Sequence, residues 1–278
     1  MASTHRLRGQ HILVTGATDG IGALTADALA RAGSIVYPHG RNAEKVERTV
    51  ASLRAHGGAA IAPRGFVADL ASLEETARLA REVPQLDVLI NNAGIGTGGS
   101  RGVRETSRDG HELRFAVNYL APFLLTRNLI AQGRAPKVVI NVSSIGQEEI
   151  DFDDPMLERG YSGSSAYCRS KLAQILFTFD LAETHPTIKT HALHPGTYLD
   201  TNMVRGANIR PLGPARDGAD ATLFVLNHAL ENGPSGQYFN QQHLARPLDQ
   251  AYDRTARKQL RSLSERLTAP YLLRAPAP

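Results

Sequence analysis

A tyrosine and a lysine four residues apart are the pair best suited to chemistry in this 278-residue chain. Tyr167 and Lys171 lie in the stretch YCRSK, inside residues 164–182, which have the pattern of a helix. Residues at i and i+4 share one face of a helix, so the phenol and the ammonium can lie beside a common site. A free tyrosine has a pKa of about 10, and a nearby positive charge favours the phenolate. We therefore expect Lys171 to lower the pKa of Tyr167 enough for proton exchange with a substrate oxygen.

A glycine-rich turn near the start of the chain predicts a dinucleotide site. The apolar, β-rich residues 11–15 are followed at once by Gly16, Gly20 and Gly22, and residues 23–32 then have the pattern of a helix. Glycines permit a tight turn and a close approach of the backbone to a pyrophosphate, and a helix N-terminus offers free N–H groups. An ordinary strand–helix turn with extra glycine is the alternative, but the strand–turn–helix context favours a nucleotide.

In the order of its motifs the chain resembles the short-chain dehydrogenase/reductase family. Residues 15–22 (TGATDGIG) match the family's T-G-x-x-x-G-I-G pattern, and residues 91–94 (NNAG) match its N-N-A-G segment. Asn118 in FAVNYLAPF, the serines of NVSS, the YCRSK stretch and the turn Pro195-Gly196 follow in the family's order. The resemblance covers about residues 10–267 and is strongest to the retinol-dehydrogenase-like branch. Membrane-bound members of that branch carry an apolar N-terminal anchor, whereas residues 1–10 are polar and basic here.

The resemblance implies a catalytic set made of Asn118, Ser144, Tyr167 and Lys171. Ser144 would donate a hydrogen bond to the substrate oxygen, and Tyr167 would donate the proton. Lys171 would also bind the nicotinamide ribose, and Asn118 would support a water-linked proton path to the lysine. Ser143 is the second choice for the serine, because neighbours in an extended segment face opposite sides. The alternative for either serine is a strand-end residue that only satisfies local backbone groups.

The end of the second predicted strand indicates which dinucleotide is bound. In NAD sites an acidic residue about 20 positions past the glycine turn binds the ribose 2′-hydroxyl. Gly40 holds that place here and Arg41 follows it, and a guanidinium can bind a 2′-phosphate with two hydrogen bonds. We therefore expect NADP(H), with NAD(H) possible, and His39 as a further candidate contact. Two points oppose this: Arg41 also fits an ordinary polar loop, and many NADP-preferring relatives have a basic residue where Asp19 stands.

The resemblance also implies the remaining cofactor contacts. Asp69-Leu70 matches the family's adenine-side pair, and Thr201 matches a threonine that can reach the cofactor's carboxamide. The alternatives are a helix N-cap for Asp69 and a turn followed by a helix cap at Thr201. The expected cofactor-binding residues are, in full, Gly16, Thr18, Asp19, Gly20, Ile21, Gly22, Arg41, Asn42, Asp69, Leu70, Asn92, Ala93, Gly94, Tyr167, Lys171, Pro195, Gly196, Thr197 and Thr201.

Apolar β-rich runs alternate with helix-like runs and must position these residues. We expect strands at 11–15, 34–38, 59–66, 86–91, 137–143, 189–194 and 237–239, and helices at 23–32, 43–55, 73–82, 111–132, 164–182, 215–230 and 248–267. The alternation predicts an α/β fold, a doubly wound parallel sheet of Rossmann type in three layers. We expect one dinucleotide-binding oxidoreductase domain over residues 1–278, with substrate loops at about 147–163 and 197–212.

The segment before Tyr167 is longer than in many short reductases and is rich in acids. It holds Glu148, Glu149, Asp151, Asp153, Asp154 and Glu158. It lacks the calcium-loop pattern, so no metal site is expected. A solvated loop is one interpretation; our hypothesis is that the loop borders the substrate pocket and disfavours anionic substrates.

Composition indicates a soluble, cytoplasmic enzyme. The net charge is +4 and the pI about 9.3, with no run of like charges that would indicate nucleic-acid binding. No apolar stretch is long enough to cross a membrane, and no secretory signal is evident. The single cysteine, Cys168, excludes an intramolecular disulfide and is expected to pack. By resemblance we expect a homodimer or homotetramer, paired through the helices that hold Asn118 and Tyr167.

These observations predict an NADP(H)-dependent oxidoreductase that interconverts a carbonyl and a primary or secondary alcohol, with tyrosine as acid and base. A catalytically silent NADP(H)-binding regulator on the same fold is the alternative, and an interaction protein with a degenerate nucleotide site is a third. Retention of Ser144, Tyr167 and Lys171 favours the enzyme over the regulator, and the intact glycines argue against the third. Substrate and direction stay open, although NADP favours reduction.

Overall fold

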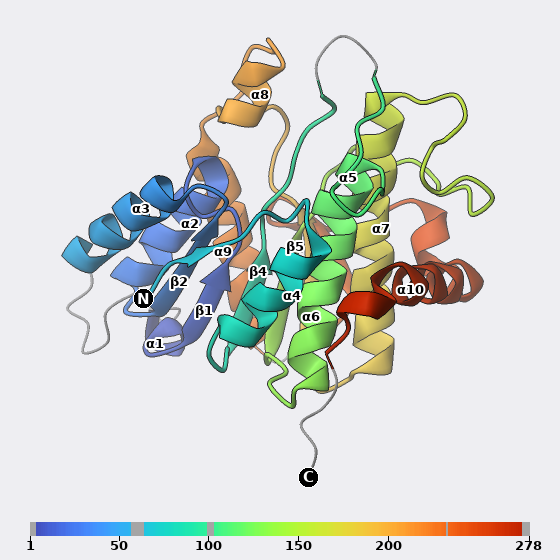
Figure 1. Cartoon of the computed structure of the whole chain (residues 1–278). Coiled ribbons are helices and arrows are strands. Elements are labelled where there is room, and N and C mark those ends of the chain that lie inside the picture. The colour runs from blue at the N-terminus through green and yellow to red at the C-terminus, as the bar shows by residue number, and fades with distance from the viewer. Residues whose placement is uncertain (1–3, 57–63, 99–102, 232, 274–278) are drawn as a thin grey trace.

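A computed structural model describes residues 4–56, 64–98, 103–231 and 233–273, and within them eight strands form one sheet in the order β3-β2-β1-β4-β5-β6-β7-β8 (Figure 1). The strands are β1 His11–Val14, β2 Ile35–Gly40, β3 Phe66–Val67, β4 Val88–Asn91, β5 Val138–Val142, β6 Lys189–His194, β7 Gln237–Asn240 and β8 His243–Ala245. The helices are α1 Thr4–Leu7, α2 Gly20–Arg31, α3 Ala43–His56, α4 Leu73–Glu82, α5 Leu113–Phe115, α6 Ala121–Ala131, α7 Gly163–Thr184, α8 Asn202–Gly206, α9 Ala215–Leu230 and α10 Arg254–Thr268. A π-helical turn, η1 Ala116–Leu120, and two 3₁₀ turns, η2 Asp249–Tyr252 and η3 Ala269–Tyr271, complete the set.

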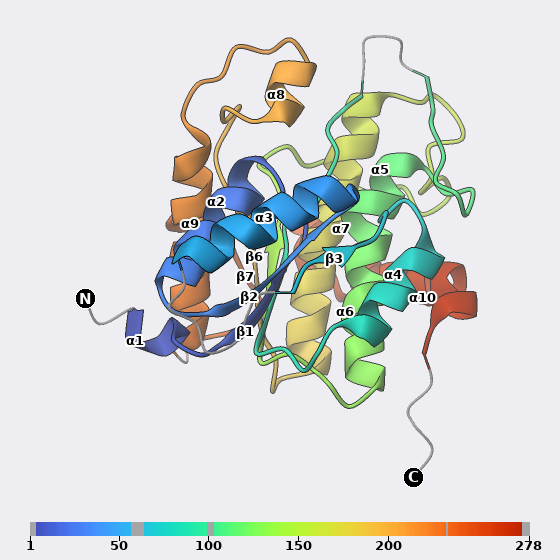
Figure 2. The same cartoon turned by 60° about the vertical axis from the view of Figure 1, so that its left-hand side comes forward.

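The sheet separates two apolar cores, so the molecule has three layers. Helices α2 and α9 cover one face, while α4, α6 and α7 cover the other, with α10 outside α7 (Figures 1 and 2). Every residue of β4 and β5 is buried, because both faces of these strands are covered. The predicted doubly wound parallel α/β fold is confirmed from β3 to β7.

The first crossovers run outward from β1 in opposite directions, and this leaves a crevice at the carboxyl ends of β1 and β4. Thr15, just past β1, donates its N–H to Ile90 of β4 over 3.0 Å. In open α/β sheets this crevice is where ligands bind. The glycine turn after β1 and the NNAG segment after β4 therefore meet at the same edge of the sheet.

Several expected elements have other bounds. Strand β8 was not predicted: it pairs antiparallel with β7 through a tight turn in which Gln241 has φ 55°. The helix expected at 111–132 is divided by η1, and Pro122 explains part of this, since it has no N–H to donate to the carbonyl four residues back, that of Asn118. The helix expected at 248–267 is a 3₁₀ turn followed by α10, which Asp253 caps by accepting from Thr255 N at 2.7 Å. Most of the strand expected at 59–66 lies outside the described residues.

The helices expected to mediate self-association, which hold Asn118 and Tyr167, contact the C-terminal part of the same chain. Helix α10 packs against α7, where Arg261 pairs with Asp180 at 2.9 Å, and the hydroxyls of Tyr119 and Ser264 lie 2.6 Å apart between η1 and α10. The segment after α10 continues over α6, since Asn128 donates to Tyr271 O at 3.1 Å. The chain therefore covers with its own C-terminal part the helices through which pairing was expected. Within the described residues, no helix is both long and apolar enough to cross a membrane.

Candidate active site

The turn between β1 and α2 forms a cradle that only glycine backbone permits. Gly16 has φ 65°, and a Cβ on it would lie 2.8 Å from Ala93 Cα. A Cβ on Gly22 would collide with the carbonyl oxygen of Gly16 and the amide of Asn92. Glycine at these positions thus lets the turn pack closely against the segment after β4 and leaves backbone at the N-terminus of a 12-residue helix, where a pyrophosphate can approach. The residues therefore fit a dinucleotide, as the motif predicts.

The residues after β4 hold this turn in place. Thr15 Oγ1 accepts from Asn92 N and from Ala93 N, both at 3.0 Å, and the Asn92 amide donates to Thr15 O at 2.9 Å. Gly94 follows, and a Cβ there would lie 3.2 Å from Asn118 Oδ1 and 3.5 Å from Lys171 Nζ. The nucleotide cradle and the predicted catalytic set therefore share this one segment.

Asp19 has a structural partner set that the sequence did not indicate. It caps α2 by accepting from Gly20 N at 2.7 Å, so the helix begins at Gly20 rather than Ala23. Its other oxygen accepts from the amide of Asn202, at the start of α8, and lies 3.9 Å from Lys45 Nζ. The position where relatives carry a basic residue is thus occupied by a helix cap that also tethers α8 to the glycine turn.

Ser144 and Tyr167 meet beside Gly146, beyond the end of β5. Gly146 N donates to Ser144 Oγ at 3.0 Å, and a Cβ on Gly146 would lie 3.5 Å from Ser144 Oγ and 3.8 Å from Tyr167 Cε1. Ser143 is directed elsewhere, because its Oγ donates to Lys171 O at 2.7 Å. Of the two serines, the structure therefore brings Ser144 to the tyrosine and uses Ser143 to fasten β5 to α7.

The expected lowering of the pKa of Tyr167 is not what the structure shows. Burial raises the pKa of Tyr167, and the hydrogen bond with Ser144 only reduces this rise. Lys171 Nζ lies 5.8 Å from the centre of the phenol ring and donates to Val142 O at 2.9 Å and to Gln174 Oε1 at 3.1 Å. Burial lowers the pKa of Lys171 to about 7, so its ammonium is only partly charged at neutral pH. Desolvation of both groups therefore outweighs the attraction that the i, i+4 spacing suggests.

Asn118 lies at the centre of η1 and has its side chain fully engaged. Its Oδ1 accepts from Ile95 N at 2.8 Å, and its Nδ2 donates to Ile95 O at 3.1 Å and to Ser170 Oγ at 2.9 Å. Asn118 thereby fixes the chain just beyond Gly94 and connects it to α7. π-Helical turns inside helices are frequent at functional sites.

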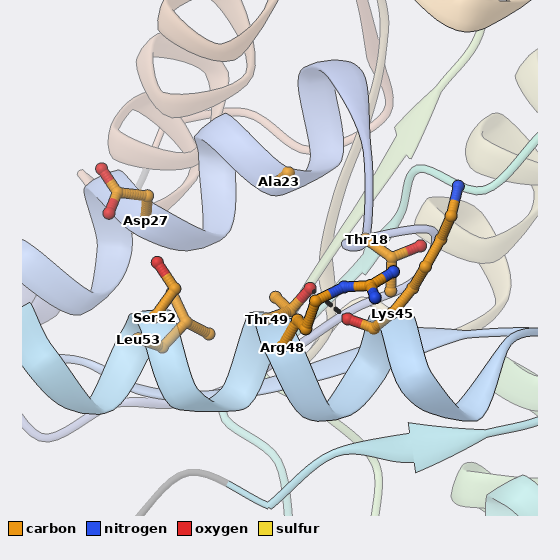
Figure 3. A pocket seen from close by; sticks show the side chains of 8 residues that line it. All are labelled: Thr18, Ala23, Asp27, Lys45, Arg48, Thr49, Ser52 and Leu53. Carbon is orange, nitrogen blue, oxygen red and sulfur yellow. Dashed lines mark hydrogen bonds between the residues drawn. The ribbon is translucent and has the colours of Figure 1, made fainter.

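At the end of β2, a side chain in place of Gly40 would require Thr18 to shift. A Cβ on Gly40 would lie 2.6 Å from Thr18 Cγ2. Arg41 is exposed, and the Asn42 side chain accepts from Lys45 N at 2.9 Å at the start of α3. A cavity of about 280 Å³ opens next to Thr18 between α2 and α3, and Lys45, Arg48 and Thr49 line it (Figure 3).

His39 is not the surface contact that the sequence suggested. It is buried, its Nδ1 accepts from Gly16 N at 3.3 Å, and its Nε2 lies 3.0 Å from Ala68 O. Burial lowers its pKa to about 4, so the ring is neutral at physiological pH with the proton on Nε2. His39 therefore supports the glycine turn from behind and ties it to the loop after β3.

That loop places Asp69 near the surface and Leu70 in the core. Asp69 Oδ1 accepts from Ala71 N at 3.0 Å, and Leu70 is 6 % exposed. The N-cap of α4 is Ser72, which accepts from Glu75 N at 3.2 Å, so the alternative of Asp69 as the cap is wrong.

The segment after β6 lies against the glycine turn. His194 Nε2 and Thr197 Oγ1 are 3.1 Å apart, and Gly196, after Pro195, has φ 139°. Thr201 caps α8 through Val204 N at 3.4 Å, and its Cγ2 would lie 3.1 Å from a Cβ on Gly20. Thr201 is thus a helix cap, as the alternative held, and also lies beside the cradle.

Three features of the site have no signal in the sequence. Tyr198, beside the Pro195 turn, is half exposed with φ 47°, and its phenol acts electrostatically on Tyr167. Tyr238 of β7 donates its hydroxyl to Ser144 O at 2.9 Å. Arg114 is buried, donates to Glu105 at 2.8 Å and lies 3.5 Å from the buried Glu112. Neither the types nor the spacing of these residues indicates the contacts, which depend on how the chain folds.

The acidic loop is partly neutralised by its own contacts. Glu148 pairs with Arg169 of α7 at 2.9 Å, and Asp154 accepts from Glu158 N at 2.8 Å and from Arg159 N at 3.0 Å. Among the residues described, no group of three or more histidine, cysteine or carboxylate side chains has the arrangement of a metal site.

Comparison with known proteins gives consistent similarities. A family model described as short chain dehydrogenase matches residues 10–211. Retinol dehydrogenase 14 of Mus musculus is 34% identical over 293 residues, which cover 93% of this chain and 86% of the relative. A protein of Streptomyces sp. strain C5, named as a daunorubicin C-13 ketoreductase, is 35% identical over 86% of this chain and 85% of its own length.

Solved structures agree with the sequence relatives. An uncharacterized protein from Mycobacterium paratuberculosis has a TM-score of 0.78 and 30% identity, with 98% of this chain and 96% of that chain covered. A short chain dehydrogenase from Escherichia coli CFT073, complexed with NADPH, has a TM-score of 0.66 and 26% identity, with 86% of this chain and 99% of that chain covered.

Proposed function

This chain belongs to the short-chain dehydrogenase family, and from that premise we propose that it interconverts carbonyls and alcohols with NADP(H), with Tyr167 as proton donor and acceptor. It is an oxidoreductase of CH–OH and carbonyl groups, as its retinol dehydrogenase and ketoreductase relatives support. The observation that carries the proposal is the meeting of Ser144 and Tyr167 beside Gly146, at the edge of the sheet where the glycine cradle lies.

In the reducing direction Tyr167 is protonated at neutral pH, as a proton donor must be. A phenol that stays protonated at neutral pH can give its proton to the oxygen of a carbonyl as negative charge develops there. Ser144 Oγ accepts from Gly146 N, which leaves its own hydrogen for the same substrate oxygen. The nicotinamide, when bound, supplies the hydride.

Lys171 is proposed to hold the ribose and to return the proton to Tyr167. Its pKa of about 7 lets the side chain exist in both protonation states near neutral pH, as a proton relay requires. Its Nζ and the amide oxygen of Asn118 both lie near Gly94, where a Cβ would be 3.5 Å from the first and 3.2 Å from the second. Asn118 is proposed as a positioning residue for this relay. Its side chain makes hydrogen bonds to Ile95 and Ser170 and so fixes the segment after Gly94 against α7.

We propose that NADP(H) is preferred over NAD(H). Gly40 offers no carboxylate of the kind that an NAD site would use, and Arg41 is exposed directly after it. Lys45 and Arg48 line the cavity beside Thr18 and add positive charge to the same corner. The charge of Asp19 does not oppose this strongly, since it is committed to the cap of α2, Asn202 and Lys45.

The substrate is proposed to be an uncharged, apolar carbonyl compound. Ile145, next to Ser144, is half exposed, and so are Tyr198 and Met203 on the segment after β6. The relatives whose names state a substrate are named for retinol and for daunorubicin. The carboxylates of the acidic loop before Tyr167 are expected to disfavour anionic substrates.

A panel of carbonyls and alcohols, followed through NADPH absorbance, tests the function. We expect apolar ketones or aldehydes to be reduced, and Tyr167→Phe to lower kcat about 100-fold or more. Arg41→Ala should raise the Kd for NADPH about tenfold and leave that for NADH unchanged. Tight NADPH binding without turnover of any compound would instead favour the silent regulator, and Tyr167→Phe with full turnover would refute the proposed acid.

A further inference from the structure

The catalytic serine lies outside the regular sheet and needs support from elsewhere. Strand β5 ends at Val142, and the last sheet-like bond in this segment joins Ser143 N to Leu193 O at 2.7 Å. Ser144 is the next residue and belongs to the turn that leads into the acidic loop. A catalytic hydroxyl must be held to within about 0.5 Å, and positions on loops are less exact than positions on strands.

The carbonyl of Ser144 is held by two side-chain donors. Tyr238 Oη donates to it at 2.9 Å and Gln147 Nε2 at 3.2 Å. Gln147 belongs to the same turn as Ser144, whereas Tyr238 comes from β7, 94 residues later in the chain. Within the described part of the chain, Tyr238 is thus the side-chain donor that connects the carbonyl of Ser144 to a strand of the sheet.

Tyr238 is suited to this purpose and unsuited to acid chemistry. It is 3 % exposed, and burial raises the pKa of its phenol well above the ordinary value, so the hydroxyl stays a donor at any working pH. Its proton is directed at a backbone carbonyl rather than at the corner beside Gly146. Tyr238 and Tyr167 therefore have different tasks, although the phenol of Tyr167 acts electrostatically on Tyr238.

The space around Tyr238 explains why the hydrogen bond matters. A cavity of about 230 Å³ lies against the ring and is lined also by Ile145, Gln147 and Leu248. The turn that holds Ser144 therefore borders an open space on the side of Ile145 and Gln147. Without the hydroxyl the turn can move toward this cavity, and the Ser144 hydroxyl moves with it.

We propose that Tyr238 is a positioning residue of the reaction: its hydroxyl fixes the backbone of Ser144 and thereby aims the Ser144 hydroxyl at the substrate oxygen. This inference rests on the proposed function. The phenylalanine variant keeps the ring and leaves Gln147 as a donor to the carbonyl, so the fold should persist.

The test compares Tyr238→Phe with Tyr37→Phe in the full chain, with the best carbonyl of the panel as substrate. Tyr37 is a matched control, since it is a buried strand tyrosine whose hydroxyl lies 2.7 Å from His11 Nδ1, away from the serine. We expect Tyr238→Phe to lower kcat about 10- to 100-fold, because a displacement of about 1 Å costs this much. The Kd for NADPH and the apparent pKa of the pH profile should stay unchanged, and Tyr37→Phe should keep wild-type kcat.

Two outcomes would overturn the inference. One is a Tyr238→Phe enzyme with wild-type kcat and a lower Tm like that of Tyr37→Phe, which would make the bond merely structural. The other is a variant as inactive as Tyr167→Phe with a shifted pH profile, which would make Tyr238 an acid. Failure of the proposed function looks different: it would appear in the wild type or in Tyr167→Phe, whatever Tyr238→Phe does.

Discussion

At the scale of single residues, the site is governed by burial more than by pairs of opposite charge. Lys171 is 4 % exposed and donates to a backbone carbonyl and an amide oxygen, neither of which carries a charge. Burial also raises the pKa of Tyr167. An ammonium that loses its hydration without gaining a carboxylate shifts toward the neutral amine. Proton exchange at this pair therefore relies on a lysine whose pKa is near 7, and not on a tyrosine whose pKa is lowered.

This shift predicts how stability depends on pH. The pKa of Lys171 is about 7 in the folded chain and 10.5 ordinarily, so between these values the unfolded chain binds more protons. The contribution of Lys171 to the free energy of unfolding is therefore fully present above pH 10.5 and is lost as the pH falls to 7. The free energy of unfolding changes by at most about 1.4 kcal/mol per pH unit over this range. Lys171→Met removes the effect. Denaturant unfolding without cofactor should show the difference in stability, variant minus wild type, decreasing from pH 7 to pH 9.5; a difference independent of pH would contradict the assignment.

His39 predicts an effect on cofactor binding without a direct contact. Its ring accepts from Gly16 N and donates to Ala68 O, so His39→Leu leaves two backbone groups without partners behind the glycine cradle. We expect the Kd for NADPH to rise about tenfold. The control is His191→Leu on β6, a buried histidine whose two ring nitrogens make no hydrogen bond within the described residues; this variant should not lower Tm and should leave the Kd within about twofold. Equal Kd values in the two variants would show that the cradle does not need His39.

At the scale of elements, a buried charge cluster joins the loops that border the site. Arg114 of α5 reaches Glu105 in the loop after β4, donates to Gly96 O at 3.3 Å and lies against Glu112. Tyr161, in the loop before α7, donates its hydroxyl to Glu112 at 3.3 Å. Arg114 and Glu112 together thus connect the loop after β4, α5 and the loop before α7.

The cluster makes a prediction about stability. Arg114→Met leaves the carboxylate of Glu112, which is 1 % exposed, buried without its cation. Removal of one partner of a buried pair typically costs about 3–5 kcal/mol. The double variant Arg114→Met/Glu112→Gln should recover a large part of this loss, since no unpaired charge stays inside. Denaturant titration measures both, and a double variant no more stable than the single one would exclude the buried charge as the cause.

At the scale of the whole molecule, the C-terminal segment decides which surfaces are available. Helix α10 crosses α7 on the outside of the molecule (Figure 1), with Arg257 on Glu183 at 2.8 Å and Arg261 on Asp180 at 2.9 Å. The Tyr119–Ser264 bond adds a contact with η1. The helices through which relatives were expected to pair are therefore already covered within one chain.

Because α10 packs on the helices expected to pair, we predict a monomer of 30.0 kDa in solution. Sedimentation equilibrium at micromolar concentration measures the mass. The variant Arg257→Glu/Arg261→Glu places like charges opposite Glu183 and Asp180, loosens α10, and should self-associate through the exposed apolar face. A wild-type dimer whose mass is insensitive to this variant would show that pairing uses another surface.

The sequence by itself determined what depends on neighbours along the chain. Apolar runs and their spacing located β6, α4 and α9 at their observed bounds, and the glycine turn and the residues around Ser144, Tyr167 and Lys171 were evident as motifs. Tertiary structure decided what depends on burial and on partners far away in the chain. In the folded chain Ser143 bonds to α7, whereas Ser144 lies at Tyr167. His39 is buried and accepts a hydrogen bond from the glycine turn. Tertiary structure also reversed the direction expected for the pKa of Tyr167, and it brought Tyr238 to the serine across 94 residues. The physical reason is that desolvation and hydrogen-bond partners are properties of a packed environment, and no local pattern contains them.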